Sequence, residues 1–336
     1  MRFHLTSEQV AIQDAVRGTL ADCWGLAQLH RFADGDADFD APSWQALMAL
    51  GIGGLALPEA VGGADLGLLD AALVCEVAGE AAAPGPLIGQ IVTAIAVAAS
   101  SNAAARALLP ELAAGTRVAT LALDAAPVPC ARAADLFLAD DGTGGLRLIE
   151  AGAGVEIEAL AATDRTRPVS QVRFAPEATS HALFSAGDPA VQRIRDAALV
   201  LIAADALGGA RHCTDQSVEY ARTREQFGQP IGKFQGLKHQ LAHMALDVEP
   251  ARALVWYAAY AWDSRLDEAP RSAALAKAHL CDVFTRTTRA AIAAHGGIGY
   301  TWEHGLNYWF RRALHNRAWL GGPALHRARA AELAGW

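Results

Sequence analysis

The chain has 336 residues, of which 52% are hydrophobic and 19% are charged, and its formal net charge is −8. This length predicts two or three domains, because a single hydrophobic core stops growing at roughly 250–300 residues. The acidic balance argues against a nucleic-acid-binding protein, which would present a basic surface. Charge or glycine interrupts every apolar stretch, so no membrane span is predicted, and the N-terminus lacks a signal-peptide core.

The cysteines are isolated from one another in the sequence. No pair has CxxC spacing, and no cysteine–histidine cluster has the spacing of a zinc site. Scattered buried thiols are typical of a reducing compartment, so we expect a cytoplasmic protein. The five positions are Cys23, Cys75, Cys130, Cys213 and Cys281.

The first part of the chain has the pattern of helices. Thr6-Ser7-Glu8 forms a helix start, and apolar residues then recur every four positions. Residues 66–79 and 87–99 predict helices buried on most sides, separated from the first helix by a glycine-rich break. We therefore expect an N-terminal helical domain over residues 1–115.

The character of the sequence changes at about residue 116. Short strand-like runs follow one another, separated by Gly, Pro and Asp, and they predict a small β domain over residues 116–187. These runs lie at 118–125, 134–139, 145–150, 155–160 and 169–174.

From residue 188 to 336 the sequence predicts long helices again, and helices of such length pack as a bundle. Their expected ranges are 191–224, 234–263, 271–294 and 305–317. The whole chain is therefore expected to be mainly α-helical, with a small β domain between two helical ones.

A turn rich in Gly and Pro, TREQFGQPIGKFQ, joins the first two long helices. Arg224 could hold a phosphate with two hydrogen bonds, and Phe227 could lie against an aromatic ring. Gln235 falls in the first turn of the next helix, where exposed N–H groups favour anions. Taken alone, the segment is more typical of a helical corner with solvated charges.

A second motif, HGGIGYTWEH, follows the third long helix. Gly296 and Gly297 would let the backbone approach a ligand closely. The run departs from the GxGxxG nucleotide-binding pattern, and no strand precedes it. Alone, it is equally consistent with the end of a helix and a turn.

Together, the two motifs resemble the C-terminal domain of the acyl-CoA dehydrogenases. LTSEQ at residues 5–9 and LALPEAVGGADLGLLDAALVCEVAGE at 55–80 resemble the first domain of that family. The likeness extends over nearly the whole chain. It implies the acyl-CoA dehydrogenase fold, with an N-terminal helical domain, a middle β domain and a C-terminal long-helix bundle.

The resemblance also implies FAD as the cofactor. Arg224 and Phe227 match the residues that contact the pyrophosphate and adenine side of a neighbouring subunit's FAD. Gln235 matches another FAD contact, and Gly296 and Gly297 match the pair that lines the dinucleotide. Contacts of this kind imply an oligomer, usually a dimer of dimers.

The family forms an α,β double bond in an acyl-CoA thioester, and a carboxylate removes the α-proton while a hydride leaves for the flavin. The usual Glu position corresponds here to Leu320, which cannot take a proton. A second family position falls near Ala198, and Asp196 is the nearest carboxylate. Because a two-residue helical step turns it off that face, we interpret Asp196 as a solvated surface residue and only a weak candidate for the base. Asp205 and Glu303 are the other nearby carboxylates, and Glu303 is expected to cap a helix.

The middle domain departs from the family, because it lacks the T-E-P-x-x-G-S-D and W-I-T segments that hold the flavin ring. Asp164 and Arg167 resemble a D-x-T-R strand start, which we interpret as a turn with solvated charges. His239 and His243 are four residues apart, but no third ligand is in register, so we expect no metal site.

Four hypotheses follow. The leading one is a flavoprotein subunit that dehydrogenates a bulky acyl-CoA together with a homologous partner. It resembles the base-lacking subunit of the heterotetrameric actinobacterial acyl-CoA dehydrogenases of steroid side-chain degradation. The alternatives are a self-sufficient homo-oligomeric dehydrogenase with an unusual base, a non-catalytic scaffold, and a flavin monooxygenase on the same fold.

Overall fold

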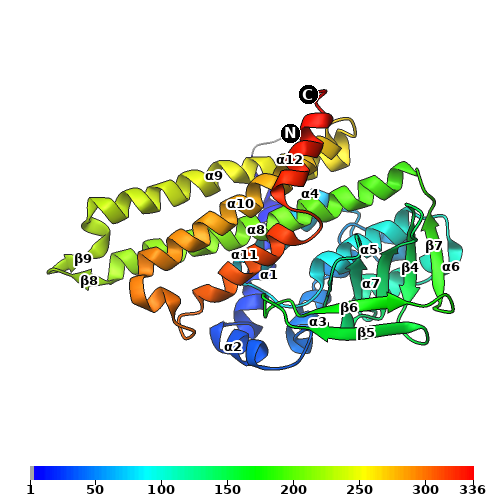
Figure 1. The fold of residues 1–336 in the computed structure, drawn as a ribbon, viewed down its shortest axis with the longest axis horizontal. Coiled ribbons are helices and arrows are strands. Elements are labelled where there is room, and N and C mark those ends of the chain that lie inside the picture. Colours follow the sequence, from blue (N-terminus) through cyan, green and yellow to red (C-terminus); the bar gives the residue numbers. More distant parts are fainter. Residues whose placement is uncertain (1–3) are drawn as a thin grey trace.

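The computed structural model describes residues 4–336, so the first three residues of the N-terminal stretch examined for a signal peptide lie outside the described part. N-terminal helices, middle β-sheets and long C-terminal helices follow one another along the chain (Figure 1). The expectation of a mainly helical chain with a small β domain is confirmed. No helix within residues 4–336 combines the length and apolar character needed to cross a membrane.

The N-terminal helices begin with a capping box, in which the Thr6 side chain accepts from the N–H of Gln9 and the Gln9 side chain accepts from the N–H of Thr6. The following helices are short, and two of them are almost wholly buried, as their apolar sequences predict. The helices are α1 (Ser7–Cys23), α2 (Leu26–Asp34), α3 (Ala41–Ala49), α4 (Leu68–Glu80), α5 (Leu87–Ala99), α6 (Ala103–Arg106) and α7 (Leu109–Ala114).

Two sheets form the middle of the chain. One has the strand order β1-β3-β4-β7, with β1 parallel to β3 and the other pairs antiparallel, and the second has the order β2-β6-β5. Strands β2 and β7 were not expected from the sequence. The strands are β1 (Ala119–Ala122), β2 (Val128–Pro129), β3 (Leu136–Asp140), β4 (Leu146–Glu150), β5 (Val155–Leu160), β6 (Val169–Phe174) and β7 (Ser180–Phe184).

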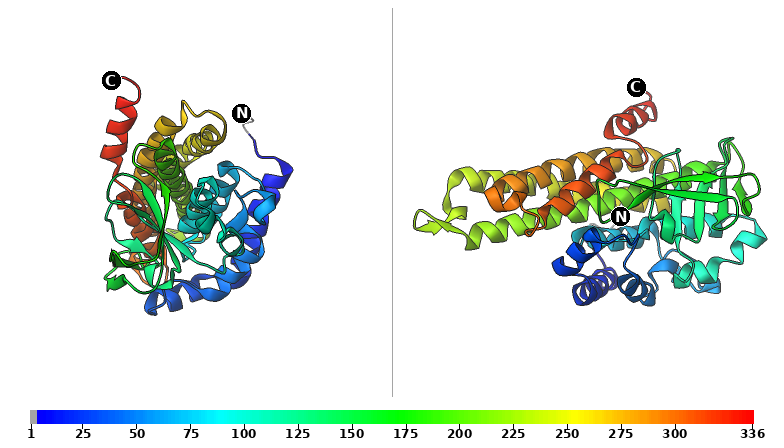
Figure 2. Two further views of the ribbon diagram at one scale, coloured as in Figure 1. Left: turned by 90° about the vertical axis from the view of Figure 1, so that its right-hand side faces the viewer. Right: turned by 60° about the horizontal axis from the view of Figure 1, so that its bottom comes forward.

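Long helices form the C-terminal bundle, and a two-stranded hairpin joins the first two. The helix α8 runs from the sheets at one end of the molecule to that hairpin at the other (Figures 1 and 2). The elements are α8 (Pro189–Thr223), β8 (Glu225–Gln226), β9 (Gln229–Pro230), α9 (Gln235–Ser264), α10 (Ala269–His295), α11 (Leu306–Ala318) and α12 (Pro323–Glu332). The sequence had not predicted α12.

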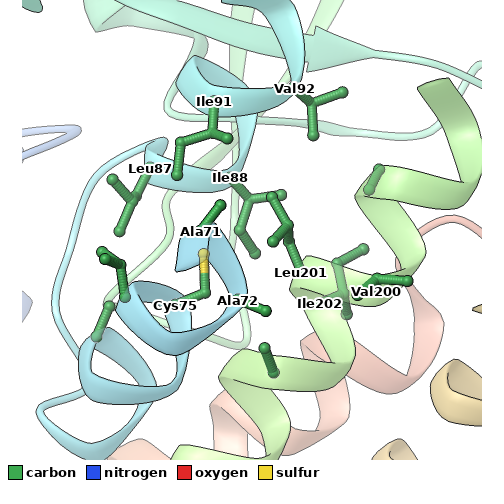
Figure 3. Close-up of a cluster of buried hydrophobic side chains, with 14 of the residues drawn as sticks. Ala71, Ala72, Cys75, Leu87, Ile88, Ile91, Val92, Val200, Leu201 and Ile202 are labelled. Atoms are coloured by element: carbon green, nitrogen blue, oxygen red, sulfur yellow. The ribbon is translucent and has the colours of Figure 1, made fainter. Parts of the chain in front are cut away.

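Small residues let the N-terminal helices approach α8 closely. Side chains of α4 and α5 meet those of α8 in one continuous apolar core (Figure 3). A Cβ on Gly208 would lie 1.7 Å from the carbonyl oxygen of Glu76, and one on Gly79 would lie 2.1 Å from that of Asp205. The high alanine and glycine content therefore serves close packing as well as helix formation.

Candidate active site

The hairpin after α8 carries three of the residues that the family resemblance singled out. Arg224 ends the helix, and its side chain is exposed. Phe227 is 93% exposed at the tip, where its φ of 53° is rare for a bulky residue, and it packs edge-on against Phe234. Gln235 is exposed in the first turn of α9, whose N–H groups receive no side-chain cap. An anion could be bound at this corner.

The glycine pair ends α10 and is also exposed. Gly296 has a φ of 64°, so its backbone conformation favours glycine. Gly297 has no such φ, and a Cβ there would meet nothing within 4 Å. No atom of the described residues therefore requires glycine at position 297. A ligand or a second subunit lying against the backbone there would require it.

Stacked aromatic rings fix the two motifs side by side. Tyr220, four residues before Arg224, stacks on His295 with ring centroids 4.4 Å apart. His295 in turn lies 4.6 Å from His304, on the segment after the glycines. The corner and the glycine bend thus share the end of the bundle that points away from the sheets (Figure 1). Sequence reasoning missed this stack, although all three rings lie next to the motifs that it recognised.

A cavity of about 320 Å³ lies between the middle domain and α11. Its walls are mainly apolar, but two of the residues that line it, Asp164 and His315, each have a buried atom without a hydrogen-bond partner among the described residues, Oδ2 and Nε2 respectively. Burial lowers the pKa of His315 to about 4, so this ring is neutral at pH 7. The remaining wall residues are Ala126, Pro127, Ala161, Ala162, Thr163, Val169, Leu314, Ala318 and Trp319.

Asp164 and Arg167 were expected to be solvated, and that interpretation was wrong. They are 1% and 5% exposed, because the turn is covered by α8 and α11. The Arg167 guanidinium donates to Asp205 at 2.6 Å, and Arg312 donates to the two oxygens of the same carboxylate at 2.5 and 3.1 Å. Asn316 completes the group at 2.6 Å. The two guanidinium groups outweigh burial and hold the pKa of Asp205 well below its usual range, so Asp205 is a permanent anion rather than a base.

A second cavity, of about 300 Å³, opens beside Leu320 between α8 and α12. Leu320 directly follows Trp319, so two consecutive residues line the two cavities. Leu320 has a φ of 53°, which strains a non-glycine residue, and strain of this kind is concentrated at functional sites. The other wall residues are Asp124, Gln192, Arg195, Leu199, Leu325, His326 and Arg329.

The expectation that Asp196 is a solvated surface residue was also wrong. The side chain is 2% exposed, and Arg329 and Gln192 donate hydrogen bonds to it. Burial raises the pKa of Asp196, and the Arg329 guanidinium opposes that rise. Both carboxylate oxygens are bound to the guanidinium, which leaves Asp196 poorly placed to accept a proton. Ala198 is fully buried and offers no base either.

Two other expectations concern surface residues. Glu303 is exposed and does not cap α11, since Gly305 occupies the N-cap position without any side-chain hydrogen bond; the cap prediction was wrong. His239 and His243 are exposed on α9. Within residues 4–336, no three His, Cys, Asp or Glu side chains are arranged to hold a metal ion.

Comparison with known proteins shows the family of the chain. The family model "Acyl-CoA dehydrogenase, N-terminal domain" matches residues 6–116, and "Acyl-CoA dehydrogenase, C-terminal domain" matches residues 190–334. The chain belongs to the acyl-CoA dehydrogenase family. It is therefore a member of a family of oxidoreductases that act on CH–CH bonds.

Individual acyl-CoA dehydrogenases match over nearly the full length. "Acyl-CoA dehydrogenase IpdE2" of Mycobacterium tuberculosis is 33% identical over 317 residues, covering 94% of both chains. The solved "Tcur3481-Tcur3483 steroid ACAD G363A variant" is 27% identical with a TM-score of 0.90, covering 98% of both chains. The "ChsE4-ChsE5 complex from Mycobacterium tuberculosis" has a TM-score of 0.86 at 23% identity, covering 100% and 99%, which shows the shared fold.

The acyl-CoA dehydrogenase family is FAD-dependent, and the cavity beside Asp164 can be tested for fit to a flavin ring. A flavin's pyrimidine edge offers an N–H between two carbonyl groups. The Asp164 carboxylate on the wall can accept from such an N–H, and the neutral His315 ring, in the tautomer with its hydrogen on Nε2, can donate to a carbonyl. Trp319 and the apolar wall suit a flat ring. The residues present therefore fit the ring, although the family's usual segments for holding it are absent.

Proposed function

We propose that this chain is an FAD-binding subunit of an acyl-CoA dehydrogenase that works with a second, homologous subunit on a bulky acyl-CoA. The observation that carries this proposal is the position of the turn between α8 and α9, where Arg224 and Gln235 could bind a phosphate. The β8–β9 hairpin, which includes Phe227 and directly follows Arg224, lies at the end of the bundle remote from the sheets (Figure 1), and Phe227 is almost fully exposed. A large exposed aromatic residue beside an unused anion site is typical of a contact with another chain.

The cofactor is proposed to extend between two subunits. Its ring would lie in the cavity beside Asp164 and His315, while Arg224, Gln235 and the glycine pair of a neighbouring subunit would hold its phosphate and adenine end. When bound, the flavin would take up the hydride that leaves the β-carbon of the acyl chain. The chain itself would bind the thioester, position it against the flavin and exclude water.

The acyl cavity is proposed to be the one beside Leu320. Leu199, Leu320 and Leu325 provide an apolar surface, and Arg195 and Arg329 lie on the same wall. The similarity to the Tcur3481-Tcur3483 steroid acyl-CoA dehydrogenase supports a bulky, polycyclic acyl group. The absence of the family's carboxylate at Leu320 supports a partner subunit, as does the existence of a solved relative that is a two-protein complex.

The flavin-to-protein ratio tests this proposal. The chain is purified alone and after co-expression with a homologous dehydrogenase subunit, and dye-linked oxidation of acyl-CoA thioesters is measured for both. We expect a colourless or weakly loaded chain alone and a yellow, active complex.

Each alternative predicts a different outcome. A yellow and active chain alone would instead indicate a self-sufficient homo-oligomer. Protein that is colourless and inert in both preparations would indicate a scaffold, and NAD(P)H-linked, oxygen-dependent turnover would indicate a monooxygenase.

A further inference from the structure

Lys277 on α10 is a buried cation without a carboxylate partner. Its side chain is 0% exposed, and no carboxylate within residues 4–336 lies at ion-pair distance from it. Asp282, on the same helix, is bound by Arg317 and Arg327 instead. Burial lowers the pKa of Lys277, because the ammonium group loses its hydration in the interior. Buried charges are normally paired, so an unpaired lysine calls for an explanation.

The ammonium group donates to two backbone carbonyl groups. Lys277 Nζ lies 2.8 Å from the oxygen of Asn316 and 2.9 Å from that of Gly321. The Asn316 carbonyl belongs to the last turn of α11, where carbonyl groups lack partners within the helix and form the negative end of its dipole. The Gly321 carbonyl lies beyond the end of the helix. One side chain thus bridges both ends of the segment that leaves α11.

The segment between these two carbonyl groups separates the two cavities. Trp319 lines the cavity beside Asp164, and Leu320 lines the cavity that opens between α8 and α12. The backbone of Leu320 has a φ of 53°, which is strained for leucine. Such strain persists only where the surrounding structure imposes it. Lys277 imposes it from the core side, and His326 on α12 holds the Leu320 carbonyl at 2.8 Å from the other side.

We infer that Lys277 is a positioning residue for hydride transfer, because it holds Trp319 and Leu320 so that the flavin ring and the acyl chain meet at the reacting distance. This inference rests on the proposed function, which puts the flavin in one cavity and the acyl group in the other. Lys277 is not a wall residue of either cavity, so it acts only through the segment that it holds.

The step that depends on this spacing is the oxidation of the acyl chain. The β C–H bond breaks and its electron pair leaves with the hydrogen as hydride to the oxidised flavin. The α-proton goes to a carboxylate of the partner subunit, and the electron pair left on the α-carbon forms the double bond. A misplacement of about 1 Å can slow such a step ~100-fold. Lys277 should therefore affect the rate of hydride transfer more than the affinity for flavin or acyl-CoA.

Anaerobic single-turnover kinetics test this role. The flavin-loaded complex is mixed with octanoyl-CoA or with the polycyclic cholanoyl-CoA, and the bleaching of the flavin is followed. The dependence of the rate on acyl-CoA concentration gives the rate constant of flavin reduction and the Kd of the acyl-CoA separately.

The variant Lys277→Met keeps an unbranched side chain of similar length but removes the charge and the donors. We expect its flavin reduction to be ~10- to 100-fold slower, with the flavin-to-protein ratio and the Kd of the acyl-CoA within ~3-fold of the unmodified complex. Lys277→Arg retains a cation with donors and should recover part of the rate. The matched control Arg271→Met removes an exposed cation from the same helix and should react normally.

A second control separates lost stability from lost position. Leu20→Ala removes buried apolar atoms from α1, which contributes no wall residue to either cavity, and it should lower the Tm without slowing flavin reduction. All rates are taken below the Tm of every variant and expressed per bound flavin. If Lys277→Met does not fold, Lys277→Gln, which retains an amide donor, takes its place.

The outcomes that contradict the inference are distinguishable from a failure of the proposed function. If Lys277→Met reduces its flavin within ~3-fold of the unmodified rate, Lys277 does not position the segment and only this inference fails. If Leu20→Ala is slowed equally at an equal loss of Tm, or if neither Lys277 variant folds, the residue is structural and the inference is again wrong. If neither acyl-CoA reduces the unmodified complex, the proposed function itself is wrong.

Discussion

Arg329 on α12 binds both carboxylate oxygens of Asp196 on α8, with N–O distances of 2.6 and 3.1 Å. The two residues are 133 positions apart in the sequence. Their contact fixes α12 against the start of α8, and it thereby closes one side of the cavity beside Leu320. The pair also explains why Asp196 is buried without being a plausible base.

Replacing Asp196 by Asn should lower the free energy of unfolding but change the turnover rate little. The change leaves the Arg329 guanidinium without its counter-ion, and we expect a loss of about 1–3 kcal/mol, below the usual value for a fully buried pair because Arg329 reaches solvent. Urea unfolding would measure this loss. The double variant Asp196→Leu, Arg329→Met should recover part of it, and a turnover rate that collapses in Asp196→Asn at full stability would contradict the structural role.

Replacing Arg224 by Ala should weaken flavin retention in the assembled complex. A charge-assisted hydrogen bond contributes about 1.5–3 kcal/mol, which corresponds to a ~10- to 150-fold rise in the Kd for FAD. Flavin release on dilution would show the change by fluorescence. Arg222→Ala is the matched control, because Arg222 lies on the same helix end, is 75% exposed and has only a distant carboxylate partner. Equal flavin affinity in both variants would show that Arg224 does not contact FAD.

The two glycines of the bend should respond differently to alanine. Gly297→Ala should leave the free energy of unfolding within about 0.5 kcal/mol, since no atom crowds the new Cβ, but it should reduce flavin occupancy. Gly296→Ala should also reduce flavin occupancy, and it should in addition lower the free energy of unfolding by about 1–2 kcal/mol, because alanine is strained at the positive φ of Gly296. Calorimetry and flavin absorbance on the same samples separate the two effects. Normal occupancy in Gly297→Ala would mean that nothing lies on the bend.

Acidification should destabilise the chain through His212. His212 stacks on Trp309 at 4.0 Å, and burial lowers the pKa of His212 from 6.5 to about 4. The unfolded chain therefore binds more protons than the folded one between these values, so stability is lost as the pH falls through that window. The variant His212→Phe keeps a ring stacked on Trp309 but cannot bind a proton. Its free energy of unfolding should therefore fall less on acidification than that of the unmodified chain, by up to a few kcal/mol. Chemical denaturation at pH 7, 6, 5 and 4 would test it, and an unchanged pH profile would exclude His212 as a contributor.

Much of the fold could be predicted because local rules determine its elements. The range predicted for α5 is the one observed, and α8 begins at Pro189 and ends at Thr223, within two residues of the prediction. The Gly- and Pro-rich segment after Arg224 was predicted as a turn between two helices, and in the structure it forms the two-stranded hairpin β8–β9. The short helix α12 was missed, because its alternating arginines and alanines present no clear apolar stripe.

Charged residues were the main source of error. Asp164, Arg167 and Asp196 were all expected in solvent, since an isolated charge in a sequence is usually exposed. Arg167 and Asp196 are buried because a counter-charge arrives from a distant segment. Asp164 accepts only local hydrogen bonds, from Thr166, and is buried because distant helices cover its turn. Such pairing cannot be recognised from one residue's neighbours in the chain.

The sequence by itself determined the order of helices and strands, the two motifs around Arg224 and Gly296, and through them the family. Those features depend on periodicity, turn chemistry and short spacings, which are local properties. Only the tertiary structure decided which charges are neutralised, which cavities exist on either side of Trp319 and Leu320, and that Lys277 binds the carbonyl groups that flank these two residues. These depend on long-range packing, because burial and hydrogen-bond satisfaction are decided by the atoms that the folded chain brings together.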